Sequence, residues 1–159
     1  CISACIRDTQ LGVGGMNHFM LPLKNARNQT SSNHKDHQDA ARYGNWAMEM
    51  LINEILKLGG IRRRLEVKIF GGANIMRSSN DIALQNINFT KEYLHNDNLT
   101  LKAQDVGDFY ARKVIYFPNS GKVKLLKITE DIANDIEVEE QSYASQISQE
   151  DTSGDIELF

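Results

Sequence analysis

Two apolar runs open the sequence, Cys1-Ile-Ser-Ala-Cys-Ile-Arg7 and Gly14-Gly-Met-Asn-His18-Phe-Met-Leu-Pro22. The polar stretch Asp8-Thr-Gln-Leu-Gly12 separates them. This pattern is typical of two neighbouring β-strands joined by a hairpin. The hairpin would bring Cys1 and His18 close in space, and a thiol near an imidazole is the minimum equipment for nucleophilic acyl chemistry. A cysteine in an apolar strand is more commonly a packed core residue, so both interpretations stay open on these features alone.

Helices and strands alternate through the rest of the chain. The predicted elements are a helix over 39–58, a strand over 65–70, a helix over 81–95, a strand over 99–103 and a hairpin of strands over 112–117 and 122–128. The polar stretch 24–39 has no hydrophobic period and is expected to be a mobile loop. The order β-β-α-β-α-β-β-β predicts an α/β or α+β sandwich, in which helices pack on a mixed β-sheet.

Both predicted helices carry apolar residues at helical spacing, which assigns a buried face to each. In the first helix, Asp39 is the expected N-cap and Gly59-Gly60 the C-terminal stop. The predicted buried face of this helix comprises Tyr43, Trp46, Ala47, Met50, Leu51, Ile55 and Leu58. The second helix has the predicted face Ile82, Leu84, Ile87, Phe89 and Leu94, while Asn86, Asn88 and Thr90 lower its helix propensity.

Length and cysteine content favour a single folded domain without disulfides. A chain of 159 residues buries a full core unaided. Cys1 and Cys5 would lie about 13 Å apart on one strand, too far for a disulfide. The sequence has no apolar run long enough for membrane insertion and no signal-peptide pattern. Reduced thiols without an export signal predict a cytoplasmic protein.

Charge is distributed unevenly along the chain. The formal net charge of −3 combines a basic body with an acidic tail. Residues 129–159 carry ten acidic side chains and no Lys or Arg, which leaves residues 1–128 with 18 basic and 11 acidic side chains, a formal charge of +7. We therefore predict a folded domain over 1–128 and a flexible acidic tail over 129–159. The tail is either a solvated end or a segment that modulates docking of the body on an acidic surface.

Other chemistry-bearing residues give weaker signals. Cys5 has no distinguishing context and is assigned to packing, and His34 with His37 lacks the further ligands that a metal site needs. Gly71-Gly72 follows a strand, either as an ordinary turn or with its amides facing a bound carbonyl as oxyanion or substrate-positioning groups. The basic residues that would suggest nucleic acid lack interleaved stacking aromatics beyond Tyr116 and Phe117, so no nucleic-acid partner is predicted. They are Arg62, Arg63, Arg64, Arg112, Lys113, Lys122, Lys124 and Lys127.

Several blocks of the sequence, in order, resemble the CheD family of bacterial chemoreceptor glutamine deamidases. The blocks are Cys1-Ile-Ser-Ala-Cys5, Gly14-Gly-Met-Asn-His-Phe-Met-Leu-Pro22, Ala41-Arg-Tyr43, Lys68-Ile-Phe-Gly-Gly-Ala73, Gln85-Asn86 with Phe89, and Arg112-Lys-Val-Ile-Tyr-Phe-Pro118 through Gly121-Lys-Val123. The blocks ending in His-Phe-Met-Leu-Pro and in Phe-Gly-Gly-Ala are the most specific. The resemblance runs from Cys1 to about Ile128 and leaves out the acidic tail.

The resemblance implies a fold of the Cys-His deamidase type, with Cys1 as nucleophile and His18 as base. It implies deamidation of glutamine side chains in the cytoplasmic domains of chemotaxis receptors through a thioester, hydrolysis of glutamyl methyl esters, and no cofactor. The family places a threonine that orients its histidine a few residues before the cysteine, and this sequence has no residue before Cys1.

Two alternatives stay open. The family also implies a regulatory role, in which the domain binds the chemotaxis phosphatase CheC with weak or no catalysis. In the other alternative, Cys1 uses its own α-amino group as the base, as N-terminal nucleophile hydrolases do.

Overall fold

The computed structural model describes residues 1–21, 34–74 and 80–128, with the backbone alone for 34–41 and 80–81. Its elements are β1 (Ile2–Asp8), β2 (Gly14–Phe19), α1 (His34–Lys57), the short 3-10 helix η1 (Arg62–Arg64), β3 (Leu65–Gly71), α2 (Asn80–Asn96), β4 (Thr100–Val106), β5 (Ala111–Phe117) and β6 (Lys122–Ile128). This order confirms the predicted alternation of strands and helices. The predicted loop lies largely outside the described residues, and the predicted acidic tail lies entirely outside them.

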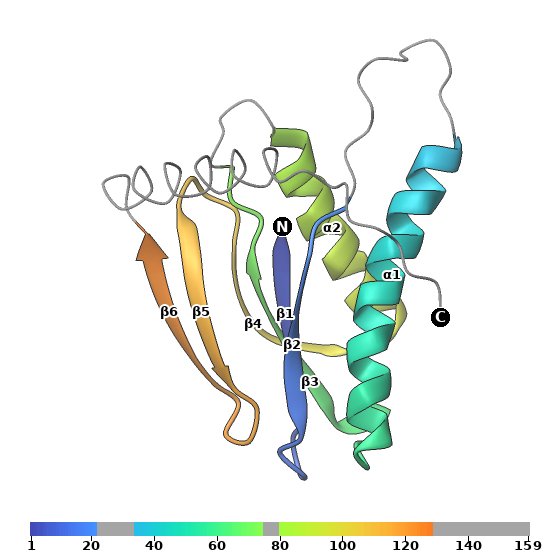
Figure 1. The fold of residues 1–159 in the computed structure, drawn as a ribbon, viewed down its shortest axis with the longest axis vertical. Coiled ribbons are helices and arrows are strands. Elements are labelled where there is room, and N and C mark those ends of the chain that lie inside the picture. Colours follow the sequence, from blue (N-terminus) through green and yellow to red (C-terminus); the bar gives the residue numbers. More distant parts are fainter. Residues whose placement is uncertain (22–33, 75–79, 129–159) are drawn as a thin grey trace, which may run out of the picture. The chain divides into compact units, whose positions relative to one another are not determined.

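Four strands form the central sheet of the compact unit Cys1–Lys127, in the order β2-β1-β3-β4 (Figure 1). β1 is antiparallel to both β2 and β3, whereas β3 and β4 are parallel. The mixed sheet and the two helices confirm an α+β fold. β5 and β6 form a separate two-stranded sheet.

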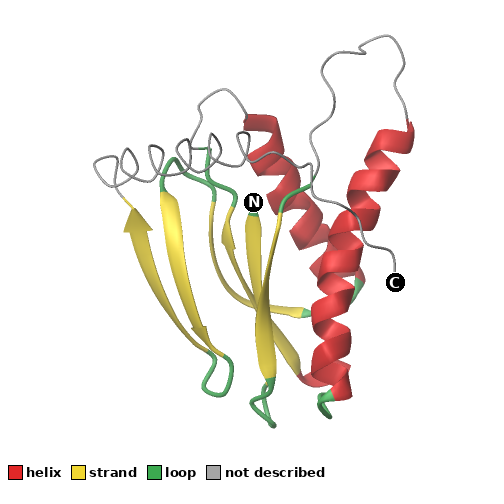
Figure 2. Cartoon of the chain, in the orientation of Figure 1, coloured by secondary structure: helices red, strands yellow, loops and turns green. Residues whose placement is uncertain are grey.

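The helices and the β5–β6 hairpin lie on opposite faces of the central sheet (Figure 2). Asn17 of β2 points to the helices, where its side-chain amide donates to the Ala47 carbonyl oxygen at 2.9 Å. On the other face, Arg7 of β1 donates to the carbonyl oxygen of Asn119 in the β5–β6 turn at 2.9 Å. Lys68 of β3 donates to the carbonyl oxygen of Gly121 in the same turn at 2.7 Å. The alternation of side chains along β1, β2 and β3 therefore sorts residues into a helix face and a hairpin face.

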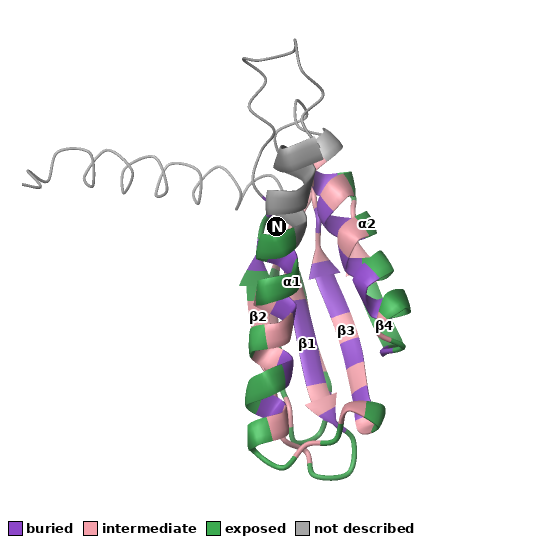
Figure 3. Cartoon of the chain, turned by 90° about the vertical axis from the view of Figure 1, so that its right-hand side faces the viewer, coloured by how far each residue is buried: buried purple, intermediate pink, exposed green. Residues whose placement is uncertain are grey.

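The main core lies between the sheet and the helices. Figure 3 shows that β1 and β3, at the centre of the sheet, carry many of the buried residues. The core includes Ile2, Ala4, Ile6, Phe19, Met48, Ile52, Ile55, Val67, Ile69 and Leu94. Phe19 packs edge-to-face against Phe89 of α2, with ring centroids 6.1 Å apart. Because even-numbered residues of β1 face this core, odd-numbered residues of β1 face the hairpin.

The predicted buried face of α1 was right at three positions and wrong at four. Ile55 is buried, and Ala47 and Leu51 pack against the core as predicted. Tyr43, Trp46, Met50 and Leu58 are exposed, whereas Met48 and Ile52, which were not predicted, are buried. Apolar residues surround much of this helix, so two stripes fit the helical spacing, and packing on the sheet selects the mainly aliphatic one. The chosen stripe contains Gly44, where a Cβ atom would lie only 2.4 Å from the Phe89 ring. The close approach of α2 to α1 thus depends on this glycine.

The ends of α1 match the prediction at one terminus only. The helix begins at His34, five residues before the expected N-cap Asp39, because the polar residues between them contain no helix breaker. It ends as predicted at the double glycine. Gly59 has a φ of +91°, and the Gly60 N–H donates to the Ile55 carbonyl oxygen at 3.0 Å. This left-handed glycine satisfies carbonyl groups of the last turn.

The buried face of α2 differs from the prediction at one apolar and two polar positions. Leu84 is exposed, while Asn86 and Thr90 are fully buried. The Asn86 side chain accepts from the Leu21 N–H at 2.9 Å and donates to the Ile82 carbonyl oxygen at 2.7 Å. Thr90 donates to the Asn86 carbonyl oxygen at 2.7 Å. These hydrogen bonds satisfy the polar side chains of Asn86 and Thr90. Both residues can therefore lie in the interior although they lower the helix propensity.

Asp8 anchors the end of β1 as a fully buried carboxylate. It accepts hydrogen bonds from the backbone of Gln10, Leu11 and Ile61 and from the Arg64 guanidinium. Burial by itself raises the pKa of the Asp8 carboxyl, but these hydrogen bonds outweigh burial and hold the pKa well below its ordinary value.

An Asp8→Asn variant is expected to be less stable at pH 7 and to lose less stability in acid. A folded-state pKa below the unfolded value gives stability that is complete above the unfolded carboxyl pKa of about 4 and disappears as pH falls through the folded value. Urea unfolding midpoints between pH 3 and pH 7 measure this effect. An equal slope against pH in the wild type and the variant would contradict it.

Candidate active site

The β1–β2 hairpin brings Cys1 and His18 to one face of the sheet. Ser3 is directly opposite His18 in the register, and Cys1 lies two residues before Ser3 on the same side of the strand. His18 faces away from the helices because its neighbours Asn17 and Phe19 both face them. Both Cys1 and His18 are exposed. As diagonal neighbours on adjacent antiparallel strands, the two residues have Cα atoms on the order of 7 Å apart.

Ser3 is a third polar side chain of this face, and the sequence reasoning missed it. The N–H groups of Ala4 and Asp8 point towards the β2 side, where they donate to Asn17 Oδ1 at 3.1 Å and to the Val13 carbonyl oxygen at 2.8 Å. Even-numbered residues of β1 therefore form the hydrogen-bonded pairs with β2. Ser3 and His18 form a non-hydrogen-bonded pair, in which side chains approach most closely. Counting by two from Cys1 would have identified Ser3.

The double glycine at the end of β3 contacts the backbone of Cys1. The Gly72 N–H donates to the Cys1 carbonyl oxygen at 2.7 Å. Gly71 has a φ of +114°, and a Cβ atom there would lie 2.6 Å from the same oxygen. At Gly72, a Cβ atom would lie 2.6 Å from Ile87 of α2. The two glycines allow this close approach, and the predicted role of their amides towards a bound carbonyl stays a prediction.

Cys5 is confirmed as a packing residue. Its side chain is fully buried on the hairpin face, whereas Cys1 is exposed. Burial raises the pKa of the Cys5 thiol to about 12, although the charge of Lys68 lowers it by a smaller amount. Cys5 is thus protonated at neutral pH and closed to substrate, which leaves Cys1 as the accessible one of the two thiols.

Other residues singled out in the sequence do not join this face. No hydrogen bond directly links Cys1 to His18 in the described part of the chain. The two residues are related only by lying on the same face of the sheet. The described residues contain no cluster of His, Cys, Asp and Glu suited to a metal ion. The side chains of His34 and His37 lie outside those described, so their metal-binding ability stays untested. Among the described residues, neither α1 nor α2 has the run of apolar sequence that a membrane span requires.

Four of the basic residues considered for nucleic acid form ion pairs within the fold, among them Lys127 with Asp105 at 3.5 Å. Arg64 pairs with Asp8 at 2.6 Å, and Arg112 pairs with Asp105 at 2.6 Å. Arg62 contacts Glu49 at 3.0 Å and also pairs with Asp97. Arg64 and Arg112 are largely buried, so their charges stabilise the fold.

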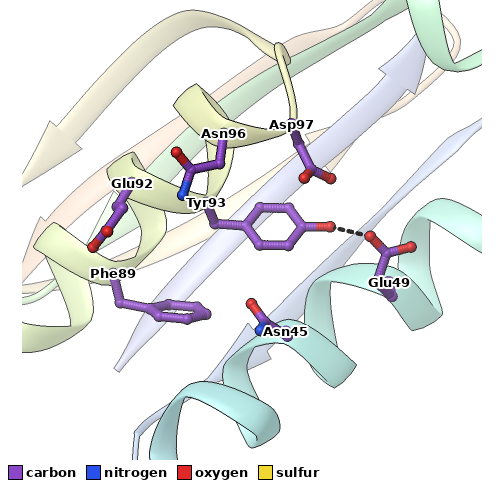
Figure 4. A pocket seen from close by; sticks show the side chains of 7 residues that line it. All are labelled: Asn45, Glu49, Phe89, Glu92, Tyr93, Asn96 and Asp97. Carbon is purple, nitrogen blue, oxygen red and sulfur yellow. Dashed lines mark hydrogen bonds between the residues drawn. The ribbon is translucent and has the colours of Figure 1, made fainter. Parts of the chain in front are cut away.

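A pocket of about 460 Å³ lies between α1 and α2, on the opposite face of the sheet from Cys1 and His18 (Figure 4). Its lining residues are Asn45, Glu49, Phe89, Glu92, Tyr93, Asn96 and Asp97. The Tyr93 hydroxyl donates to Glu49 at 2.5 Å, and burial together with this bond raises the pKa of Tyr93. The hydrogen bond from Arg62 lowers the pKa of Glu49. This network connects the two helices to η1.

The chain is similar over its whole length to several known proteins. A family model described as CheD chemotactic sensory transduction matches residues 20–127. The chain is 45% identical to a protein of Hydrogenovibrio crunogenus, over all of this chain and 81% of the relative. It is 45% identical to a protein of Hahella chejuensis and 46% identical to one of Saccharophagus degradans, over all of this chain and 74% and 73% of those relatives. Each of the three is named a probable chemoreceptor glutamine deamidase CheD.

Proposed function

The chain belongs to the CheD family, and we propose that it is a chemoreceptor glutamine deamidase with Cys1 as its nucleophile and His18 as its base. The observation that carries the residue assignment is the β1–β2 register, which puts an exposed thiol and an exposed imidazole on one face of neighbouring strands. The fold would then be of the Cys-His deamidase type. The substrate is a glutamine side chain in the cytoplasmic part of a chemoreceptor, and the protein would act in the cytoplasm.

The proposed reaction begins with proton transfer from the Cys1 thiol to the His18 imidazole. The thiolate sulfur forms a bond to the carboxamide carbon of the substrate, and the carbonyl oxygen takes up the negative charge. Protonated His18 gives its proton to the amide nitrogen as the C–N bond breaks. Ammonia leaves, and a thioester remains on Cys1.

Hydrolysis of the thioester completes the reaction. His18 takes a proton from water, and the resulting hydroxide attacks the thioester carbon. The C–S bond breaks, the sulfur regains the proton from His18, and the product is a glutamate side chain. A glutamyl methyl ester would react by the same steps with methanol as the leaving group. No cofactor takes part in these steps.

The double glycine would fix the nucleophile in this reaction. Because Gly72 donates to the Cys1 carbonyl oxygen, its N–H already has a partner. Its proposed task is therefore to position Cys1. Stabilisation of the oxyanion falls to another donor near the sulfur, and we propose the Cys1 N–H. Removing one oxyanion donor typically lowers the rate by about 10²–10³-fold.

A Gly71→Ala variant is expected to lose about tenfold to a hundredfold of the deamidation rate, since small misplacements of a reacting group have effects of this size. The added methyl would lie 2.6 Å from the Cys1 carbonyl oxygen, so the nucleophile must shift. Gly107→Ala is the matched control. Gly107 also has a positive φ, of +85°, but an added methyl would meet nothing within 4 Å. Equal rates in the two variants would contradict the positioning role.

Ammonia release from a purified cytoplasmic fragment of a chemoreceptor tests the function itself. We expect ammonia to appear in proportion to the amount of protein, and none when the fragment carries glutamate at its modification sites. A fragment rich in accessible glutamine that yields no ammonia with the folded protein would overturn the proposal.

A regulatory function as a binding partner of CheC stays the alternative proposal. Binding of CheC by a Cys1→Ala variant, measured by pull-down, would support it. Normal deamidation by the intact chain would argue against a purely regulatory role.

A further inference from the structure

The outer side of the β5–β6 hairpin has an unusual composition. Side chains alternate along both strands, and those that point away from the central sheet are Lys113, Ile115, Phe117, Lys122, Lys124 and Leu126. We call this set the hairpin outer face. Each member is either a lysine or an apolar residue. Ile115, Phe117 and Leu126 are 46%, 43% and 57% exposed. Exposed apolar side chains together with charged ones are typical of an interaction surface.

Contacts on the inner side of the hairpin fix the orientation of this face. The Arg112 guanidinium is almost fully buried and donates to Asp105 at 2.7 Å and to the Gly107 carbonyl oxygen at 2.8 Å. Tyr116 points inward too, and burial raises its pKa to about 12. The turn is bound to β1 and β3 through Arg7 and Lys68. The hairpin is thus held on the central sheet, and its outer face is presented to solvent.

The lysines of this face are not neutralised by the fold. In the described part of the chain, no carboxylate lies in ion-pair contact with Lys113, Lys122 or Lys124. The ammonium group of Lys124 instead lies 5.8 Å from the centre of the Phe117 ring. By contrast, Arg62, Arg64 and Arg112 pair with carboxylates of the fold. The uncompensated positive charge selects an acidic partner.

We propose that the hairpin outer face docks an acidic amphipathic helix, and that this helix belongs to the receptor substrate. The proposal rests on the proposed function for the identity of the partner. A helix is about 10 Å wide, which matches two strands about 5 Å apart. An apolar stripe of the helix would cover Ile115, Phe117 and Leu126, and its carboxylates would meet the lysines. The hairpin lies on the same face of the central sheet as Cys1 and His18, so one partner can contact both.

Two pairs of single substitutions test the docking surface on the full chain. Lys124→Glu is paired with Lys91→Glu, an equal change of charge at an exposed position of α2 on the other side of the sheet. Phe117→Ser is paired with Leu84→Ser, where the α2 side chain is 57% exposed. Lys124→Glu and Phe117→Ser are expected to raise the KM for the receptor fragment by about tenfold or more and to leave kcat unchanged. The two α2 variants should behave as the wild type.

Salt gives a second readout of the same contact. The wild-type KM should rise with ionic strength because exposed charges are screened, and this rise should be smaller in Lys124→Glu. If ammonia is released but Lys124→Glu and Phe117→Ser match their controls, the docking surface is wrong and the deamidase function stands.

A binding measurement that does not depend on catalysis tests the docking surface separately from the deamidase function. Titration of the receptor fragment into the Cys1→Ala protein measures affinity even where no ammonia is formed. Loss of that affinity in Cys1→Ala combined with Lys124→Glu supports the docking surface even if the deamidase proposal fails. No binding to Cys1→Ala, or binding that is indifferent to the charge of residue 124, overturns the docking surface.

Discussion

Replacing Cys1 by alanine is expected to abolish ammonia release from the receptor fragment. Covalent catalysis needs an accessible thiolate, and Cys5, the other cysteine of the sequence, is fully buried with a raised pKa. Alanine removes the sulfur and keeps the backbone that pairs with Gly72. A coupled ammonia assay measures the loss, and circular dichroism verifies that the variant is folded.

Cys5→Ala is the matched control for this substitution. It also removes a sulfur atom, from a side chain that lies further along the same run of sequence and on the same face of the sheet. The cavity should cost on the order of 1 kcal/mol of folding free energy, while the protein that remains folded keeps its activity. Wild-type turnover by Cys1→Ala, or loss of turnover in folded Cys5→Ala, would contradict the assignment of the nucleophile.

Replacing His18 by alanine is expected to lower kcat by about 10²–10⁴-fold, the range typical of a positioned acid and base. Both the formation of the thiolate and the protonation of the departing ammonia would be lost. Free imidazole added to the assay should restore part of the rate, because the substituted position is exposed and open to solvent. His95→Ala, at the exposed end of α2, should retain full activity. Unchanged kcat in His18→Ala would remove His18 from the mechanism.

The hairpin and the order of elements could be predicted because they depend on local signals. Alternating apolar residues define β1 and β3, and the turns at Gly12 and Gly121 each have a φ of +69° that glycine adopts without strain. The placement of Cys1 near His18 followed from the same signals. Each of these depends on neighbours in sequence, and local chemistry is enough to determine them.

The buried face of α1 could not be predicted from the helix alone. Tyr43, Trp46 and Met50 follow the helical spacing as well as Met48 and Ile52 do, and only packing against the sheet distinguishes the two sets. The same applies to Asn86, whose partner is the Leu21 N–H, 65 positions away in the sequence. Long-range partners decide these positions.

The sequence alone also could not show which basic residues are available to a partner, because this depends on tertiary contacts. Sequence composition showed a body of formal charge +7, but it did not show which charges are used internally. Arg64 and Arg112 are bound to Asp8 and Asp105 inside the fold. The lysines of the hairpin outer face remain outside such pairs, which turns a general excess of charge into one defined surface.

Peptide mass spectrometry of a receptor cytoplasmic fragment, treated in parallel with the wild-type protein and with Cys1→Ala, tests the central claim most directly. The wild type is expected to convert specific glutamines to glutamate, each seen as the mass difference between an amide and a carboxyl group. Cys1→Ala is expected to leave every glutamine unchanged. Unchanged glutamines after treatment with the folded wild type, or equal conversion by both proteins, would contradict the account.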